Sequence, residues 1–226
     1  MAELGTLERT TGSDVIFDKL FDQIIRLDLL PGTKISETEI AKTFGYSRQP
    51  VREAFMRLAN LNLLLIRPQR ATVVRPFSRK LIANARFVRA AIELEIVRAA
   101  ARDRDKTLDG ALKTNLRKQA DAIAAEDAGQ FHDLDYEFHR LLCACAKQSF
   151  AFAIIAENKA QVDRLCMLAL TNKDAMGVLY KDHELLLEAL FGQNEEAAVA
   201  VLRRHLDRLT PTIAAIYTTH QAYFDE

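Results

Sequence analysis

Histidines are few in this chain, and three of them occur where a metal ligand could lie. His183 and His205 each sit among leucines at helical spacing, so both side chains are expected to point into a core. His139 follows Asp135 by four residues along the edge of an apolar helix face, which places an imidazole beside a carboxylate. A carboxylate in that position needs a partner, because an unpaired buried charge is costly. We therefore predict that Asp135, His139, His183 and His205 converge from separate helices as metal ligands.

Imidazole and carboxylate groups are donors that zinc, nickel, cobalt and manganese accept, with zinc as the first expectation. Each residue alone has a simpler interpretation, since a single inward histidine is usually a hydrogen-bonded core residue. His220 could also face inward, whereas His132 is expected to face the solvent. The convergence of all four predicted ligands is what favours a divalent metal ion.

Arginines upstream of these ligands could bind an anion. Arg86, Arg89 and Glu93 fall on one stripe of a long expected helix, at spacings of three and four. The stripe could be exposed, with only a weak pair between Arg89 and Glu93. Alternatively, the planar guanidinium groups point into a cavity and hold a ligand carboxylate. We predict Arg89 and Arg86 as effector-binding residues on this second interpretation.

Positive charge is concentrated in an earlier segment of the chain. The formal net charge of the whole chain is +0, but from Ile40 to Lys80 there are nine lysines and arginines against one acidic residue. From Leu81 onward 18 basic residues face 22 acidic ones. Such a segment suits a polyanionic partner, and a solvated basic face is the alternative.

The elements around this basic segment are expected to be short helices. Helical spacing of apolar residues from Ile16 to Leu27 predicts a first helix, and Pro31-Gly32 ends this segment in a turn. Ser36 and Glu39 form a capping-box pattern that starts a second helix, and Gly45 ends it in a left-handed conformation. A third helix then follows after a turn of a few residues.

The third helix is expected to present polar residues near its N-terminal end. Ser47 can cap it, and the inward set of apolar residues leaves Arg48, Gln49 and Arg52 pointing outward. Arginine can bond guanine and glutamine can bond adenine, while free amides at a helix start suit phosphate. Strands at 63–66 and 71–74 would follow as a β wing, with Arg70 at its basic tip.

The same residues carry a family resemblance. The segment Ser47-Arg48-Gln49-Pro50-Val51-Arg52-Glu53-Ala54 resembles the signature Ser-Arg-x-Pro-Val-Arg-Glu-Ala of the winged-helix domain in GntR-type regulators. The resemblance implies that Ser47, Arg48, Gln49 and Arg52 contact DNA, with Arg70 in or beside the minor groove. One departure is Ala71, where that family often has glycine in the wing.

The remainder of the chain shows no strong strand signal and also resembles a known domain. The pattern Asp135-x-x-Phe138-His139-x-x-Leu142, followed by His183 and His205, is similar to the metal-binding signature of the FCD domain in the FadR subgroup. Arg89 with Glu93 matches its Arg-x-x-x-Glu. The resemblance implies a helical domain that binds a metal and an effector, and a homodimeric protein.

Composition and patterning together indicate a mainly α fold. We expect a winged helix-turn-helix at 1–75, a linker at 76–80, and an all-helical bundle at 81–226 that binds metal and effector and dimerises. No apolar run reaches the length of a membrane span, so a cytoplasmic protein without membrane contact is expected. The three cysteines sit in helical patterns and are expected to be buried or inert thiols.

The function predicted from these features is that of a bacterial sequence-specific transcriptional regulator, with repression as the expected sign. A small organic acid would bind at the metal site and control binding to an inverted-repeat operator in double-stranded DNA. One alternative is a metal-dependent enzyme that acts on a small carboxylate. The other is a regulator whose metal only braces the bundle.

Overall fold

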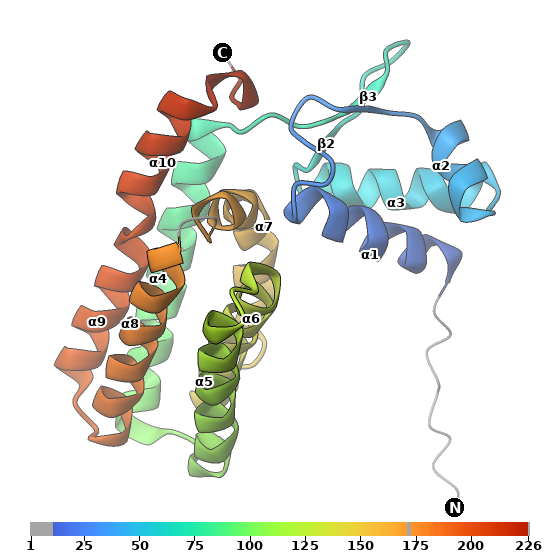
Figure 1. The fold of residues 1–226 in the computed structure, drawn as a ribbon. Coiled ribbons are helices and arrows are strands. Elements are labelled where there is room, and N and C mark those ends of the chain that lie inside the picture. Colours follow the sequence, from blue (N-terminus) through green and yellow to red (C-terminus); the bar gives the residue numbers. More distant parts are fainter. Residues whose placement is uncertain (1–10, 171–172, 226) are drawn as a thin grey trace, which may run out of the picture. The chain divides into compact units, whose positions relative to one another are not determined.

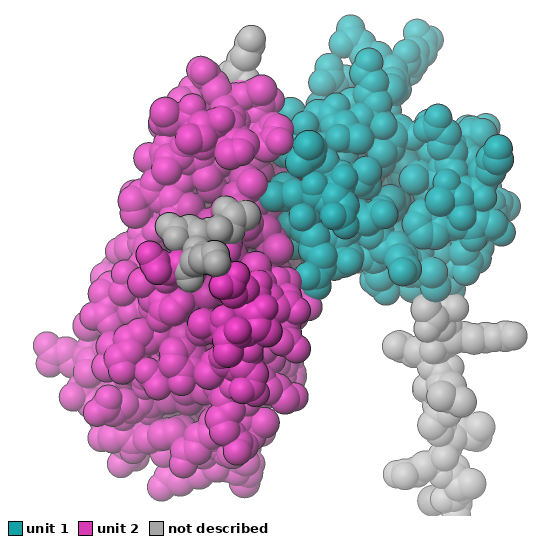
Figure 2. Space-filling view, viewed as in Figure 1, with its two compact units in different colours: residues 1–76 teal, residues 77–226 magenta. Residues whose placement is uncertain are grey.

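The computed structural model describes residues 11–170 and 173–225, and the chain divides into two compact units (Figure 1). The first unit comprises residues 1–76 and the second residues 77–226 (Figure 2). The described residues are mostly helical, and the short strands all lie in the first unit. This confirms the expected fold class, mainly α with an N-terminal winged helix-turn-helix and a C-terminal helical bundle.

Three helices form the body of the first unit: α1 (Gly12–Ile25), α2 (Glu37–Phe44) and α3 (Arg48–Asn60). The hydroxyl of Ser36 accepts a hydrogen bond from the Glu39 amide at 3.1 Å and so caps α2. Gly45 ends α2 with φ of 71°, in the left-handed region that glycine adopts at low cost. Gly45 therefore ends α2 as the sequence predicts.

The core of the first unit lies between α1 and α3. Apolar residues at helical spacing on both helices are fully buried, and side chains from the strands close the core from the other side. The buried set consists of Ile16, Leu20, Ile24, Val51, Ala54, Phe55, Leu58, Leu63, Leu64 and Val74. Because α3 uses this face for packing, its opposite face is left to the solvent.

A small antiparallel sheet completes the first unit, in the order β1-β3-β2. Strands β2 (Leu64–Leu65) and β3 (Thr72–Val74) lie within the two predicted strands but are shorter. Strand β1 (Lys34–Ile35), which pairs with β3, was not predicted, because two residues carry no alternating pattern. At the hairpin tip the Arg70 amide bonds the Arg67 carbonyl at 3.3 Å.

The second unit is a bundle organised around the long helix α4 (Arg79–Asp103). Its other helices are α5 (Asp109–Ala124), α6 (Ala128–Cys145), α7 (Ala151–Leu170), α8 (Lys173–Phe191), α9 (Glu195–Asp207) and α10 (Leu209–Thr219), with short turns η1 (Lys106–Leu108) and η2 (Gln221–Tyr223). Helix α4 packs against α6, α7, α8 and α9, and α5 packs against α6 and α8. This places α6, α8 and α9, which carry the predicted metal ligands, around one interior.

The chain enters the second unit through a buried residue. Phe77 is fully buried, its amide donates to the Tyr223 carbonyl at 2.7 Å, and its ring lies 5.2 Å from the ring of Phe224. The division between the units falls after Pro76, and α4 begins at Arg79. Within the described part of the chain, no helix has both the length and the apolar character that a bilayer span needs.

Candidate metal centre and nucleic-acid interface

The N-terminal end of α3 presents the residues expected to meet DNA. Four residues at this end are exposed, namely Ser47, Arg48, Gln49 and Arg52. The neighbouring Val51, on the inner face of the helix, is fully buried. The backbone of Ser47 is extended, as at a helix N-cap, but its side chain makes no capping hydrogen bond. The free amides of the first turn of α3 therefore remain available to an acceptor such as a phosphate.

An acidic residue of α2 holds the two arginines of this surface. Arg48 Nη2 and Arg52 Nη2 each lie 3.3 Å from Oε2 of Glu37. Gln49 Nε2 donates to Oε1 of Glu53 at 3.0 Å. Because Arg48 and Arg52 are largely exposed, these pairs are weak and can be exchanged for contacts with DNA. Arg70 is exposed at the tip of the wing.

The four predicted metal ligands come together in the second unit. Asp135 and His139 lie on α6, His183 on α8 and His205 on α9. One ligand atom from each lies within 4.8 Å of every other. The three histidines are buried, and Asp135 is partly exposed.

Hydrogen bonds to a glutamine fix how His183 faces the cluster. The amide nitrogen of Gln119 donates to Asn115 at 2.7 Å, which leaves Oε1 of Gln119 as an acceptor. Nδ1 of His183 lies 2.8 Å from that oxygen, so Nδ1 carries the proton and Nε2 keeps its lone pair. Nε2 lies 3.5 Å from Oδ1 of Asp135. The ring of His183 therefore offers an unprotonated nitrogen to the centre.

A carboxylate lies close to the ring of His139. Oε2 of Glu93 lies 2.7 Å from Nδ1 of His139, and Oε1 of Glu93 accepts from Nε of Arg89 at 2.7 Å. Nε2 of His139 then faces Oδ1 of Asp135 at 3.7 Å. Carboxylate partners of this kind orient a metal-binding imidazole and raise its basicity.

The surroundings keep Asp135 ionised and keep His183 and His205 neutral. Burial alone would raise the pKa of Asp135, but the charge of Lys159 and the nearby imidazoles hold it well below its usual range. Burial lowers the pKa of His183 to about 3 and also lowers the pKa of His205. Neutral imidazoles and an ionised carboxylate are the forms that bind a metal.

The residues fit a divalent metal ion. Nε2 of His139 and Nε2 of His183 are buried and have no hydrogen-bond partner among the described residues. Buried polar nitrogens without a partner are unfavourable, and a cation placed between them and Asp135 would satisfy them. Asp135, His139, His183 and His205 would hold the ion, which would supply a positive charge able to accept a ligand oxygen.

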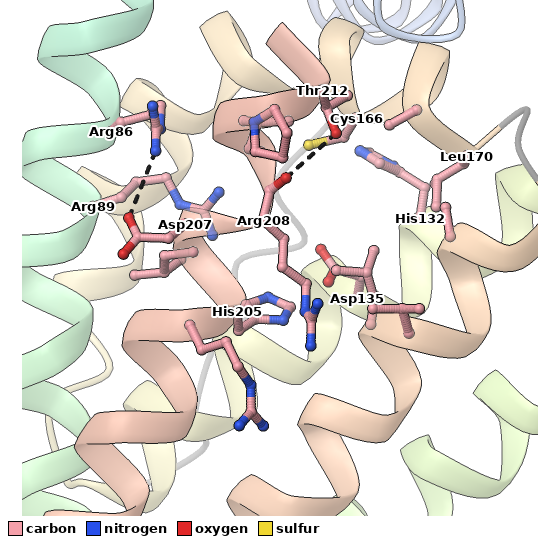
Figure 3. Close-up of a pocket in the computed structure, with 18 of the residues that line it drawn as sticks. Arg86, Arg89, His132, Asp135, Cys166, Leu170, His205, Asp207, Arg208 and Thr212 are labelled. Atoms are coloured by element: carbon pink, nitrogen blue, oxygen red, sulfur yellow. Dashed lines mark hydrogen bonds and ion pairs between the residues drawn. The ribbon is translucent and has the colours of Figure 1, made fainter. Parts of the chain in front are cut away.

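A cavity of about 660 Å³ opens beside this cluster (Figure 3). Asp135 and His205 line it, as do Arg86 and Arg89, and His132 and Leu170 lie on the opposite side from the two arginines. Its other polar lining residues are Cys166, Asp174, Arg204, Asp207, Arg208 and Thr212. A small molecule in the cavity could therefore touch the metal ligands and the arginines together.

The two arginines predicted to bind an effector both line the cavity, and both already have partners. Arg89 is buried and bonds Glu93, so the interpretation of the pair as an exposed stripe is wrong for these residues. Helix α4 packs against α7 and α9, and Arg86 is partly buried. Arg86 donates to the Thr210 hydroxyl at 2.5 Å and lies 3.7 Å from Asp207.

Several residues near the centre were missed or misplaced by sequence reasoning. His132 was expected to face the solvent but is buried, because α7 covers that side of α6 and brings Asp163 to 3.4 Å from Nε2 of His132. Lys159 and Gln119 are also buried at the centre. A lysine followed four residues later by an aspartate, within the apolar helix α7, is the signal that could have pointed to the first of them.

The three cysteines were expected to be buried or inert, and two of them are buried. Cys143 and Cys145 are buried, and burial raises the pKa of these thiols to about 12 and about 11. Cys166 is half-buried and lines the cavity, and burial raises its pKa to about 11. All three are free thiols held in the protonated form at neutral pH.

Comparisons with known proteins match both units. Residues 13–74 match the bacterial regulatory proteins of the gntR family, and residues 85–208 match the FCD domain. The HTH-type transcriptional repressor RspR of Escherichia coli is 33% identical over 211 residues, which cover 93% of this chain and 92% of that protein. The probable D-xylose utilization operon transcriptional repressor of Paenarthrobacter nicotinovorans is 28% identical, with 92% of this chain and 91% of that protein covered.

A solved structure has the same fold. The Escherichia coli protein McbR/YncC superposes with a TM-score of 0.79 at 20% identity, covering 94% of this chain and 100% of that one. The matched families and relatives are transcription regulators and not enzymes. This chain therefore belongs to the GntR family of bacterial transcriptional regulators, with a winged helix-turn-helix followed by an FCD domain.

Proposed function

We propose that this protein is a homodimeric, cytoplasmic repressor that binds an operator through α3 and the wing, and that a small organic acid bound beside a divalent metal ion controls it. The observation that carries the proposal is the cavity of the second unit. One hollow is lined by two metal-ligand candidates, Asp135 and His205, and by Arg86 and Arg89. A carboxylate is the ligand group that suits both a metal ion and a guanidinium.

The DNA-binding part of the proposal rests on the exposed end of α3. Arg48, Gln49 and Arg52 carry the donors and acceptors that read base edges in a major groove. Ser47 and the free amides beside it suit a phosphate, and exposed Arg70 suits the minor groove or the backbone next to it. Two copies of this unit in a dimer would read an inverted repeat.

Repression is proposed because the relatives of this chain include repressors. The relatives named above are called repressors, and a repressor must bind its operator in one state and release it in another. An effector achieves this only when it binds one arrangement of the protein better than the other. Zinc is the first candidate for the metal, because it takes imidazole and carboxylate ligands together, and nickel, cobalt and manganese accept the same donors.

A metal that only braces the bundle is the second candidate role. Its support is that the four ligands come from three helices, so an ion would cross-link α6, α8 and α9. The two roles differ in what the acid does. A bracing metal predicts lower stability without the metal but no acid response in the folded protein.

Two measurements test the proposal. The operator is first selected from a random DNA library with the full chain. Thermal unfolding of the zinc-loaded protein is then followed with small carboxylic and sugar acids, because a ligand of the native state raises stability by RT ln(1 + [L]/Kd). We expect one class of acid to raise the unfolding temperature and to release the selected DNA.

The control variants separate the roles of the histidines. His183→Ala should lose both acid effects while it keeps DNA binding. His220→Ala removes a half-buried histidine of the same unit that lies outside the ligand cluster, and it should behave like the wild type. An acid response that survives both chelation and His183→Ala would contradict the metal-linked effector site.

A further inference from the structure

A buried lysine lies beside the metal centre, and the function proposed above leaves it without a role. Lys159 of α7 is 1% exposed. Its Nζ lies 2.6 Å from Oδ1 of Asp163 and 3.5 Å from Oδ2 of Asp135. The ring of Tyr136 covers it, with the ring centroid 5.5 Å from Nζ. Burying an ammonium group is unfavourable unless it is paired, so a lysine at this position calls for an explanation.

The two oxygens of Asp135 face different partners. Oδ1 lies 3.5 Å from Nε2 of His183 and 3.7 Å from Nε2 of His139, on the side of the ligand cluster. Oδ2 lies on the side of Lys159. One oxygen of Asp135 thus faces the histidines of the cluster, and the other faces the ammonium group of Lys159.

We propose that Lys159 is a positioning residue of the metal centre: it holds Oδ2 of Asp135, so that Asp135 offers a single oxygen to the metal and room is left for a carboxylate ligand. This inference rests on the proposed function, because it assumes that a divalent ion binds to the cluster. A carboxylate that is free to turn could offer both of its oxygens to a cation, and the second oxygen would then compete with an incoming anion.

The positive charge of Lys159 also favours the binding of a carboxylate ligand. Lys159 places a positive charge 3.5 Å from Oδ2 of Asp135. This charge attracts an anion that approaches the metal, and removal of Lys159 would remove that attraction.

The simpler alternative is that Lys159 and Asp163 are only an internal pair of α7, at a spacing of four residues. The pair would then stabilise the bundle and have no influence on ligands at the centre. Substitutions of the two residues distinguish the interpretations, because removal of Lys159 and removal of the Asp163 charge should change anion affinity in opposite directions.

The experiment uses the full chain loaded with Co²⁺, whose visible absorption reports the number and kind of its ligands, and acetate as the anion. Wild type, Lys159→Met and Asp163→Asn are compared. The matched control is Lys147→Met, which removes an exposed lysine paired with Asp103 in the same unit. Co²⁺ affinity, the absorption spectrum and the acetate affinity of the loaded protein are measured for each.

We expect Lys159→Met to change the Co²⁺ spectrum and to weaken acetate binding roughly tenfold, since a nearby charge acts strongly in a buried site. Asp163→Asn should strengthen acetate binding by a similar factor, and Lys147→Met should match the wild type. Lys159→Met leaves Asp163 buried without its cation, so this variant is the one at risk of failing to fold. In that case Asp163→Asn alone decides the question.

The outcomes separate this inference from the function on which it rests. Wild-type protein that does not bind Co²⁺ would overturn the metal centre itself. Wild-type protein that binds Co²⁺, with an unchanged spectrum and unchanged acetate affinity in Lys159→Met, would overturn only the role of Lys159. Acetate binding in Asp163→Asn that is equal to or weaker than in wild type would also overturn it.

Discussion

Oε2 of Glu93 lies 2.7 Å from Nδ1 of His139, so a residue of α4 orients a predicted metal ligand of α6. The other oxygen of Glu93 is held by Arg89, which lines the cavity. Burial alone would raise the pKa of Glu93, but the charge of Arg89 lowers it, so the carboxylate stays ionised. A ligand that draws Arg89 into the cavity would therefore act on His139 through one intervening side chain.

Glu93→Gln should weaken metal binding by about 10- to 100-fold, as is typical when the partner of a metal-binding imidazole is changed. The amide keeps the shape of the side chain but loses the charge that holds the tautomer of His139. Metal affinity is measured by competition with a chromophoric chelator. Glu195→Gln is the matched control, because Glu195 forms an exposed pair with Arg102 at 2.6 Å. Equal metal affinity in the two variants would show that Glu93 does not support the centre.

The metal-free protein should lose stability as the pH falls. Burial lowers the pKa of His183 to about 3, whereas an unfolded histidine titrates near 6.5. The unfolded state therefore takes up a proton below about pH 6.5 that the folded state refuses. For each such histidine the free energy of unfolding then falls by about 1.4 kcal/mol per pH unit.

Urea unfolding of chelator-treated protein, measured between about pH 7 and about pH 5, checks this prediction and stays above the range of ordinary carboxylates. His183→Gln should show a shallower slope than the wild type. His220→Gln should not, because His220 lies half-buried and outside the ligand cluster. A slope that is the same in all three proteins would argue against a neutral, buried His183.

Arg52→Ala should weaken binding to the selected operator by about 1–3 kcal/mol and relax its sequence preference, if Arg52 reads a base. A contact to phosphate alone would instead lower the salt dependence and leave the preference unchanged. Fluorescence anisotropy at several salt concentrations distinguishes the two. Arg117→Ala, which removes an exposed arginine of α5, is the control for nonspecific loss of charge. Unchanged affinity and salt slope in Arg52→Ala would remove this residue from the interface.

Glu37→Gln should increase nonspecific affinity for DNA. Glu37 pairs with both Arg48 and Arg52 at 3.3 Å, and it would lie near the phosphates if α3 enters a groove. Removing its charge frees the arginines and reduces repulsion, so we expect a gain of roughly 0.5–1 kcal/mol. The measurement is binding to DNA of unrelated sequence at low salt. Weaker binding would mean that Glu37 chiefly organises the arginines.

Much of the first unit could be predicted from local sequence. The turn at Gly45, the cap at Ser36 and the exposed end of α3 follow from backbone chemistry within a few residues, and the structure has each of them. Strand β1 could not be predicted, since two residues pair with β3 only because tertiary folding brings them together. The sequence predicted a linker at 76–80, but it did not show that Phe77 within this linker is held by the distant residues Tyr223 and Phe224.

For the candidate metal cluster, too, one part could be predicted from the sequence and another part could not. Helical periodicity by itself predicted that His139, His183 and His205 point inward, because each lies at helical spacing from apolar residues on the same helix face. Only the tertiary structure decided what lies around them: Glu93 from α4, Gln119 from α5 and Lys159 from α7. Periodicity assigns a residue to a face of its own helix. Which side chains it contacts depends on which helices pack together and on their relative position along the helix axis. The sequence therefore predicted which residues meet in this interior, and packing determined their orientation, their partners and the cavity beside them.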